Sequence, residues 1–402
     1  MTRSVLITLG RLPKALDIAR ALSQAGCRVI VAEPFSWHLT RASRYVAKCY
    51  TTPSPVQDQR AYVASLLEII EREGVSLVVP VSEEVLHVSL IDQNLPENVT
   101  FFSVDHDQLR ALHDKHDFNQ LAAKVGLAVP ETCLLGTPEG QDLANRCDYI
   151  LKPANTCSGK GFSKHAQGEA LPSTDGLPRT LVQEQMKGAL KSTFSICHQG
   201  RVIGTVVYQA AILSDSVAVA FELLDQETMI ETWIERFVES TGHTGFVSFD
   251  MMENEEGVPH AIECNPRATS GIHFVEPEDL AGAVLDPANQ TRLRVSKTRL
   301  KYQFWSSLTE TQSAVFGEES ALEKAKIMWK AKEVNFAWRD PLPLWLMPFT
   351  SWPIMKRAFL NGETFGEAST FDIAWMEETG NEPDCTQDTD IKSTRQSARE
   401  AS

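Results

Sequence analysis

The sequence predicts an N-terminal α/β domain with a parallel sheet, followed by an α+β region and a C-terminal extension. Three observations support this fold class. Residues 4–33 read as strand, helix and strand, the repeat that builds parallel sheets. Residues 193–211 and 245–265 each read as two strands joined by a short polar turn, which is typical of antiparallel hairpins. After residue 290 the periodic pattern weakens, which separates the extension from the rest.

The N-terminal domain is expected to cover residues 1–108. Pro13 is placed to start a helix after the first strand, and Gly26 ends that helix before a second strand at 28–33. The remaining elements are expected to be a helix at about 58–73, a third strand at 77–81, a helix capped by Ser82, and a fourth strand at 101–104. The turn at 10–13 lacks the GxGxxG spacing, so it gives only weak support for a dinucleotide site.

Glu83 follows the third strand of this domain. Ligands of open parallel sheets bind outside the carboxyl ends of the strands, so Glu83 is a candidate substrate contact. An acid in the first turn of a helix is an equally good explanation, because it interacts favourably with the helix dipole.

The second domain is expected to span residues 109–290, with a smaller lid subdomain at about 126–187. A helix over 107–125 opens it and carries Lys115 near its middle. Lys115 is a candidate phosphate contact, although a lone lysine is more often simply solvated. The strand at 149–153 carries a second lysine, Lys152, directly before a proline.

A loop rich in small residues follows that strand, from Ala154 to Phe162. Backbone N–H groups of such a loop can close over phosphate oxygens, and Lys160 adds positive charge. The spacing is not that of a Walker A motif, and a flexible turn is the alternative. The candidate phosphate contacts in this loop are Ser158, Gly159, Lys160 and Gly161.

The next strand, at 181–186, leads into a hinge at Lys187-Gly188. A hinge offers backbone N–H and C=O groups to the edge of an adenine ring, and Met186 can pack against the ring face. Further along, a loop of small polar residues after Arg267 can hold a second substrate. Ser270 and His273 are its candidate contacts, although a structural histidine is at least as probable for His273.

The stretch His260 to Arg267 presents an acid, an amide and a guanidinium in a row. Glu263 and Asn265 are two residues apart, so they point to the same face of a strand. Thirteen residues before Glu263, the preceding strand ends in Asp250, and a hairpin would bring it beside the other two. Carboxylate and amide oxygens suit a hard divalent cation such as Mg²⁺, with Mn²⁺ as a substitute. Strand-end charges without a metal are the alternative.

The composition sets limits on function. The net charge of −15 argues against a general binder of nucleic acid or anionic membranes, but it leaves local phosphate pockets open. The eight cysteines form no CxxC pair, so we expect reduced thiols and a cytoplasmic protein. No apolar run approaches the roughly 20 residues of a membrane helix, so no membrane span is expected.

The C-terminal extension is expected at residues 291–375, and residues 376–402 are expected to be disordered because they offer little to bury. The segment at 340–349 is apolar but interrupted by prolines. It is interpreted as a cap over the core, with a partner or lipid surface as the alternative.

Taken in order, these features resemble the ATP-grasp superfamily. The residues that carry the resemblance are Lys115, the Leu-Lys-Pro strand end at Lys152, the glycine loop at 158–161, the Gln-Glu-Gln-Met hinge, Asp250 and the Glu-Cys-Asn-Pro-Arg run. The resemblance covers about residues 4–290. It implies an ATP-grasp fold of two α+β subdomains that hold ATP, and ligation of a carboxylate to an amine through an acyl phosphate. Many members of the family are dimers, so a homodimer is a possible partner arrangement.

The resemblance also implies roles for single residues. Lys115 and Lys152 would contact the α- and β-phosphates, and residues 158–161 would cover the γ-phosphate. Glu184 and Met186 would lie on the adenine side of the hinge. Asp250, Glu263 and Asn265 would hold one or two Mg²⁺ ions, and Arg267 would steady the transferred phosphate. One departure is that many relatives carry Gly-x-Glu after the hinge, for the ribose, where this chain has Gly188, Ala189 and Leu190.

Several stretches look like the mycosporine-biosynthesis ligase group that joins glycine to 4-deoxygadusol. These stretches are 14–33, 35–55, 262–274 and 340–345. The sequence therefore predicts an ATP-dependent ligase that phosphorylates a small-molecule acceptor and joins it to an amine. The alternatives are a small-molecule kinase or carboxylase with the same nucleotide pocket, or a non-catalytic nucleotide-binding protein, for which the missing ribose acid is the only support.

Overall fold

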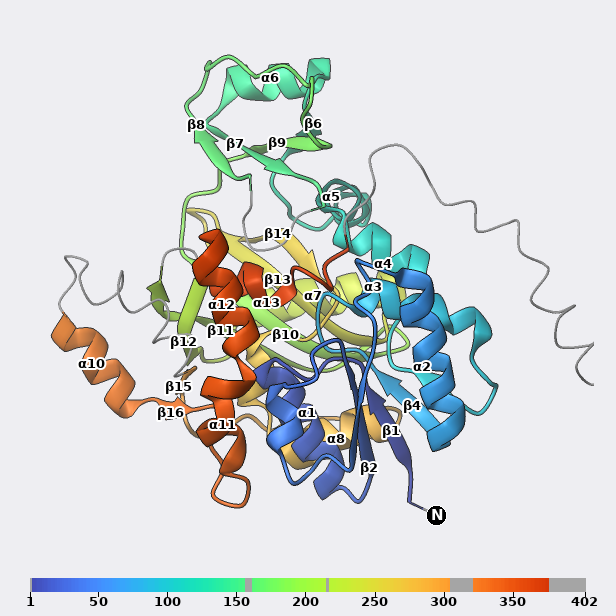
Figure 1. Ribbon diagram of the computed structural model, residues 1–402. Coiled ribbons are helices and arrows are strands. Elements are labelled where there is room, and N and C mark those ends of the chain that lie inside the picture. The colour runs from blue at the N-terminus through green and yellow to red at the C-terminus, as the bar shows by residue number, and fades with distance from the viewer. Residues whose placement is uncertain (1, 156–160, 215–216, 304–320, 376–402) are drawn as a thin grey trace, which may run out of the picture.

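Five parallel strands form the N-terminal sheet of the computed structural model, which describes residues 2–155, 161–214, 217–303 and 321–375 (Figure 1). The strand order is β3-β2-β1-β4-β5, so the chain starts in the middle of the sheet and builds outward. The bounds are Ser4–Ile7 for β1, Arg28–Glu33 for β2, Lys48–Thr51 for β3, Val75–Val79 for β4 and Thr100–Phe101 for β5. Parallel pairing confirms the predicted class of this domain.

One strand of this sheet was not predicted. The β3 segment Lys-Cys-Tyr-Thr is partly exposed along its whole length, because it forms an edge of the sheet. It therefore lacks the apolar run by which the inner strands are recognised. The expected set of four strands was wrong for this physical reason.

Helices cover both faces of the N-terminal sheet. Helix α1 (Pro13–Gln24) and helix α8 (Pro277–Leu285) pack on one face, and helix α2 (Gln59–Glu73) packs on the other. Pro13 opens α1 as predicted, and Gly74 ends α2 in the left-handed conformation. The predicted cap at Ser82 was wrong. The short helix α3 (Val85–Val88) has Glu84 at its N-cap, and the Glu84 carboxylate instead accepts the backbone N–H groups of Val81 and Ser82.

The single helix expected over 107–125 is two helices, α4 (His106–His113) and α5 (Lys115–Lys124). Asp114 lies between them with extended backbone, and its carboxylate accepts the N–H groups of His116 and Asp117. A well-formed N-cap therefore restarts the helix, and Lys115 becomes its first residue rather than a mid-helix residue.

A seven-stranded sheet forms the centre of the molecule, in the order β14-β13-β10-β11-β12-β15-β16. Its strands are Leu190–His198 (β10), Arg201–Ser214 (β11), Val217–Leu223 (β12), Gly245–Glu253 (β13), Pro259–Asn265 (β14), Leu300–Tyr302 (β15) and Lys332–Glu333 (β16). Both predicted hairpins are confirmed as antiparallel pairs. Helix α7 (Thr228–Thr241) packs on one face through Trp233 and Phe237, and the turn η3 (Ser270–Phe274) packs on the other.

A smaller four-stranded sheet, β6-β9-β7-β8, stands apart at the top of Figure 1. Its strands are Thr132–Leu134 (β6), Tyr149–Pro153 (β7), Ser163–His165 (β8) and Thr180–Glu184 (β9), and helix α6 (Pro138–Arg146) covers it. Its own small core contains Leu143, Tyr149 and Val182. The strand carrying Lys152 and the strand leading to the hinge are therefore neighbours in one unit.

The C-terminal extension contains helices Ala321–Lys330 (α10), Leu342–Thr350 (α11), Trp352–Asn361 (α12) and Phe365–Thr370 (α13). The inner side of α11 caps the N-terminal domain, because Met347 is buried against Leu16 and Leu39. The outer side is exposed, with Trp345 71% and Phe349 68% accessible to solvent. The predicted tail at 376–402 lies outside the described residues. Within the described ranges, every helix is too short or too polar to span a bilayer.

Replacing Glu73 with glutamine is expected to lower the free energy of unfolding by about 1 kcal/mol at neutral pH. The Glu73 carboxylate, at the end of α2, accepts hydrogen bonds from Lys48 (2.7 Å), Tyr50 and Arg28 (2.5 Å), which lower its pKa from 4.5 to about 2. Because the pKa is lower in the folded state, the stabilisation is complete above pH 4.5 and is lost as the pH falls toward 2.

Urea denaturation of the wild type and the variant across this acidic range measures the effect. Glu68→Gln is the matched control, since Glu68 lies on the same helix in an exposed pair with Arg72. An equal loss of stability in the two variants, independent of pH, would contradict the prediction.

Candidate functional site

The hairpin of β13 and β14 brings three predicted metal ligands together. Asp250 pairs with Glu263 across the two strands, and Asn265 pairs with Ser248 two positions further along. The Asn265 side-chain amide donates toward the Asp250 carboxylate, at 3.4 Å. Pro266 ends the strand, as its missing N–H requires. Local strand geometry alone therefore produces a cluster of carboxylate and amide oxygens.

Electrostatics within this cluster favour a bound cation. Burial and the neighbouring Glu263 raise the pKa of Asp250 to about 6. Two neighbouring carboxylates repel each other when both are ionised, and a bound divalent ion offsets this repulsion. The Ser192 hydroxyl, on neighbouring strand β10, donates to Asp250 Oδ1 at 2.6 Å and orients it. The donor set of carboxylate and amide oxygens fits Mg²⁺ or Mn²⁺.

Two lysines from different elements interact electrostatically with this cluster. Lys115 Nζ lies 3.8 Å from Glu263 Oε1, and its backbone N–H is bonded to Ala154 at the base of the glycine loop. Lys152 Nζ donates to the carbonyl of Ile262 at 3.0 Å. Burial lowers the pKa of Lys152 to about 8, with Glu263 opposing the shift and Lys115 adding to it. Two buried cations beside two acids are the arrangement that polyphosphate with a divalent ion requires.

Arg267 joins this cluster to the N-terminal domain. Its Nη2 atom lies 2.8 Å from Asn265 Oδ1 and 2.5 Å from Glu83 Oε1. Glu83 therefore contacts an arginine of the other domain at the carboxyl edge of the parallel sheet. Its side chain is only 6% exposed. The edge of the parallel sheet and the tip of β14 form one polar junction.

His113 at the end of α4 faces the same junction. Burial lowers the pKa of His113, while Glu83 raises it and Lys115 and Arg267 lower it. Its Nε2 atom has no hydrogen-bond partner among the described residues. Neither His113 nor Ser192 was identified from the sequence, because only the tertiary fold brings α4 and β10 to the hairpin.

The two candidate substrate contacts after Arg267 have different surroundings. His273 Nδ1 lies 2.5 Å from Asp17 Oδ2 on α1, and the His273 carbonyl accepts a hydrogen bond from Lys301. The Asp17 contact ties the histidine to the N-terminal domain, and the Lys301 contact ties it to β15, which favours a structural role for His273. Ser270 is the partly exposed first residue of η3. A role of either residue in substrate binding stays a prediction.

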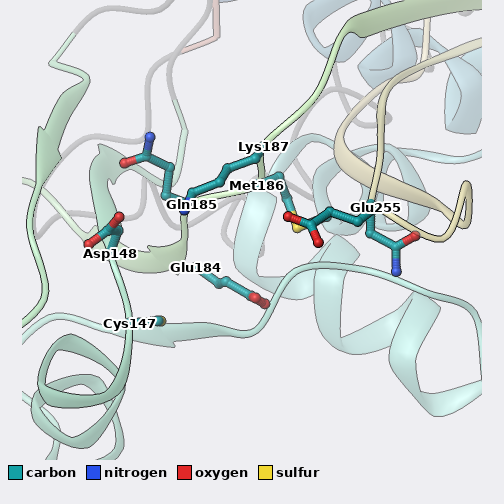
Figure 2. Close-up of a pocket in the computed structure, with 8 residues that line it drawn as sticks. Cys147, Asp148, Glu184, Gln185, Met186, Lys187 and Glu255 are labelled. Atoms are coloured by element: carbon teal, nitrogen blue, oxygen red, sulfur yellow. The ribbon is translucent and has the colours of Figure 1, made fainter.

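The predicted adenine side of the hinge lines a cavity of about 250 Å³ (Figure 2). Figure 2 shows its residues on three segments, which are the connection between α6 and β7, the hinge after β9 and the turn between β13 and β14. The lining residues are Cys147, Asp148, Glu184, Gln185, Met186, Lys187, Asn254 and Glu255. Glu184 and Met186 therefore line a cavity together with the turn that joins the strands of Asp250 and Glu263.

The hinge itself requires glycine. Gly188 has φ of +146°, and a Cβ atom there would lie 2.6 Å from the carbonyl oxygen of Glu253. Leu190, where many relatives carry an acid two residues after this glycine, is 49% exposed. In the predicted phosphate loop, Gly161 has φ of +72°, whereas Ser158, Gly159 and Lys160 lie outside the described residues.

Residues 112–271 match a family model described as an ATP-grasp domain. The comparison with curated proteins found no match. Among solved structures, the chain is similar to N5-carboxyaminoimidazole synthetase from Staphylococcus aureus, with 10% identity, TM-score 0.60, and coverage of 79% of this chain and 87% of that one.

Two further solved structures are similar over comparable lengths. Biotin carboxylase from Campylobacter jejuni shares 14% identity, with TM-score 0.58 and coverage of 75% and 74%. L-amino acid ligase from Bacillus licheniformis shares 14% identity, with TM-score 0.54 and coverage of 71% and 74%. At such identities these similarities show a shared fold.

Proposed function

We propose that this chain, which has the ATP-grasp fold and carries an ATP-grasp domain at residues 112–271, is an ATP-dependent ligase that forms a C–N bond. The enzyme phosphorylates an oxygen of a small-molecule acceptor and then joins the acceptor to an amine. ADP and phosphate are released. ATP is a substrate, and Mg²⁺ or Mn²⁺ is the cofactor.

The observation that carries this proposal is the convergence of two acids, one amide and two lysines at one point. Asp250, Glu263 and Asn265 come from the β13–β14 hairpin, Lys115 from the start of α5, and Lys152 from the small sheet. The turn of the same hairpin, at Asn254 and Glu255, lines the hinge cavity. The arrangement suits a nucleotide whose base lies at the hinge and whose phosphates reach the carboxylates.

Each group of residues has a physical task in this reaction. The acidic cluster would hold the divalent ion, which supplies charge neutralisation for the phosphates. Lys115 and Lys152 neutralise phosphate charge that remains, and the low pKa of Lys152 rises when an anion binds beside it. Once the acceptor oxygen is phosphorylated, it leaves as phosphate more readily than it would leave as hydroxide.

The proposed reaction has two steps. An acceptor oxygen attacks the γ-phosphorus, the bond from that phosphorus to the bridging oxygen breaks, and ADP leaves. The amine nitrogen then attacks the activated carbon, the carbon–oxygen bond breaks, and phosphate leaves with the original acceptor oxygen. Arg267 would hold the transferred phosphate, and its hydrogen bond to Asn265 at the strand tip supports this role.

The polar junction of Glu83, Arg267 and His113 is the proposed acceptor side. It lies at the carboxyl edge of the parallel sheet, where open α/β sheets bind ligands. The segments 14–33, 35–55 and 262–274 support a narrower proposal. In that proposal the amine is an amino acid such as glycine, and the acceptor is a cyclic enol or ketone, as in the mycosporine glycine ligases that these segments resemble.

Incubation with MgATP and cell metabolite extract, followed by mass spectrometry and ADP measurement, tests the function. We expect ADP release that requires both an acceptor and an amine, and a product whose mass is the sum of the two minus water. Phosphorylated product without an amine would indicate a small-molecule kinase instead. Dependence on bicarbonate would indicate a carboxylase, and nucleotide binding without ADP release would indicate a non-catalytic protein.

A further inference from the structure

The outer side of helices α11 and α12, together with the turn before α11, exposes large aromatic side chains at regular intervals. Trp338, Trp345, Trp352 and Phe359 follow one another at intervals of seven residues. They are 89%, 71%, 59% and 88% exposed. Leu342 and Phe349 lie one turn away on α11 and are 54% and 68% exposed. We define these six side chains as the aromatic face.

The backbone keeps the helical part of this row on one side of the molecule. Ser351, between α11 and α12, has helical φ and ψ, and helical hydrogen bonds continue from Ser351 to Met347 and from Met355 to Ser351. Seven residues are close to two helical turns, so Trp345, Trp352 and Phe359 project in nearly the same direction. Figure 1 shows α11 and α12 running end to end along the molecule.

The inner side of the same helices is fixed to the N-terminal domain. Met347 and Ile354 are 2% exposed, and Met347 packs against Leu16 and Leu39. Ahead of α11, Asp340 accepts hydrogen bonds from Arg20 at 2.9 Å and from Ser43 at 2.7 Å. The aromatic face is therefore held rigidly outward, and its exposure does not come from a loose end of the chain.

The exposed charges of the segment that carries the aromatic face have one sign. Between residues 332 and 361, the exposed charged side chains are Lys332, Arg339 and Lys356. The two acids of that segment are engaged internally, because Asp340 is buried with Arg20 and Glu333 bonds to Asn335 and Phe336. This segment is thus positive on its surface, although the chain as a whole carries a charge of −15.

We propose that the aromatic face binds the surface of an anionic lipid bilayer, with the helices lying in the plane of the headgroups. Tryptophan and phenylalanine favour the boundary between headgroups and acyl chains, and lysine or arginine beside them attracts anionic lipids. Repulsion from the remaining acidic surface is weak beyond about 10 Å at physiological salt, so the local positive charge determines the orientation. Such binding needs no membrane-spanning helix.

Flotation of the full chain with lipid vesicles tests this proposal without any measurement of turnover, so its outcome is independent of the proposed ligase reaction. We expect binding to phosphatidylcholine vesicles that contain phosphatidylserine, weaker binding to phosphatidylcholine alone, and a further decrease with added salt. The triple variant Trp345→Ala, Trp352→Ala, Phe359→Ala is expected to lose binding by at least about a hundred-fold. Lys356→Glu is expected to weaken it by about five- to ten-fold.

Met229→Ala and Lys124→Glu are the matched controls, because both residues are exposed and lie on other helices. They are expected to bind vesicles like the wild type. Since the replaced aromatic side chains are exposed, all variants should unfold at wild-type urea concentrations.

Three results would overturn the proposal. These are absence of wild-type binding to the anionic vesicles, equal binding to both vesicle types, and retained binding in the triple variant. If the wild type is a dimer that does not bind vesicles, and the triple variant is a monomer, the face is a contact between two copies of the chain.

Discussion

Replacing Glu263 with glutamine is expected to reduce ADP release by about a thousand-fold, or roughly 4 kcal/mol of transition-state stabilisation. Glu263 is the residue on which the candidate site converges, since it pairs with Asp250, lies 3.8 Å from Lys115, and acts electrostatically on Lys152. The glutamine keeps one oxygen but loses the negative charge that would hold the divalent ion. Steady-state ADP release over a range of Mg²⁺ concentrations measures the effect.

The control for this variant is Glu256→Gln, in the turn between the same two strands. Glu256 is exposed, and its carboxylate accepts a hydrogen bond from Asn254 of the same turn, so its charge can be removed without touching the cluster. It should keep wild-type turnover. Both variants should also keep the wild-type unfolding midpoint, because the strand pairing is unchanged. Wild-type turnover in Glu263→Gln would remove the metal assignment and the ligase proposal with it.

The substitution Asn265→Asp tests whether Asn265 is a metal ligand or only a structural hydrogen-bond donor. The substitution keeps an oxygen that can bind the metal but removes the N–H donor to Asp250 and adds a third negative charge. We therefore expect activity that is partly recovered at high Mg²⁺, whereas a purely structural role for the amide predicts a loss that Mg²⁺ does not relieve. Asn265→Ala would lose the activity under both conditions.

The hairpin of the candidate site could be predicted because its information is local. A strand period of two places Glu263 and Asn265 on one face, and a polar turn of the right length returns the chain to Asp250. No tertiary contact is needed for that inference. The same holds for α1, where Pro13 and Gly26 mark the limits within a single window of sequence.

The partners of these residues could not be predicted, because they come from distant segments. Ser192 reaches Asp250 only through the pairing of β10 with β13, and Glu83 reaches Arg267 only when two domains pack together. Serine and glutamate at these positions have ordinary local explanations. Likewise, Asp114 looked like one more polar residue in a long helix, whereas its side chain caps α5 and starts that helix at Lys115.

Replacing Asp372 with alanine is expected to lower the free energy of unfolding by about 3–5 kcal/mol. Asp372 follows helix α13 and binds Arg11 in the turn before α1, with contacts of 2.6 and 3.1 Å to the two terminal guanidinium nitrogens. The Arg11 side chain is fully buried, and its second acidic partner is Glu33 at the end of β2. Removing one acid leaves a buried guanidinium with too little compensating charge.

Glu33 shows why the network depends on both acids. Burial would raise the pKa of Glu33, but Arg11 and the backbone N–H of Gly10 outweigh it and lower the pKa. The two carboxylates together raise the pKa of Arg11 above its ordinary value. With Asp372 absent, Glu33 alone must balance an arginine that also lies over the ring of Phe35.

Urea denaturation with a fluorescence readout, together with limited proteolysis of the C-terminal segment, measures this effect. The control is Glu363→Gln, which breaks the partly exposed pair with Arg357 on the same segment and should cost at most about 1 kcal/mol. An equal cost in the two variants would mean that the buried network adds nothing beyond an ordinary surface pair. We expect a larger loss of unfolding free energy for Asp372→Ala, together with earlier cleavage between α12 and Trp375. That result would show that the ion pair of Asp372 and Arg11 holds the C-terminal segment against the carboxyl edge of the parallel sheet, the edge at which the proposed acceptor side lies.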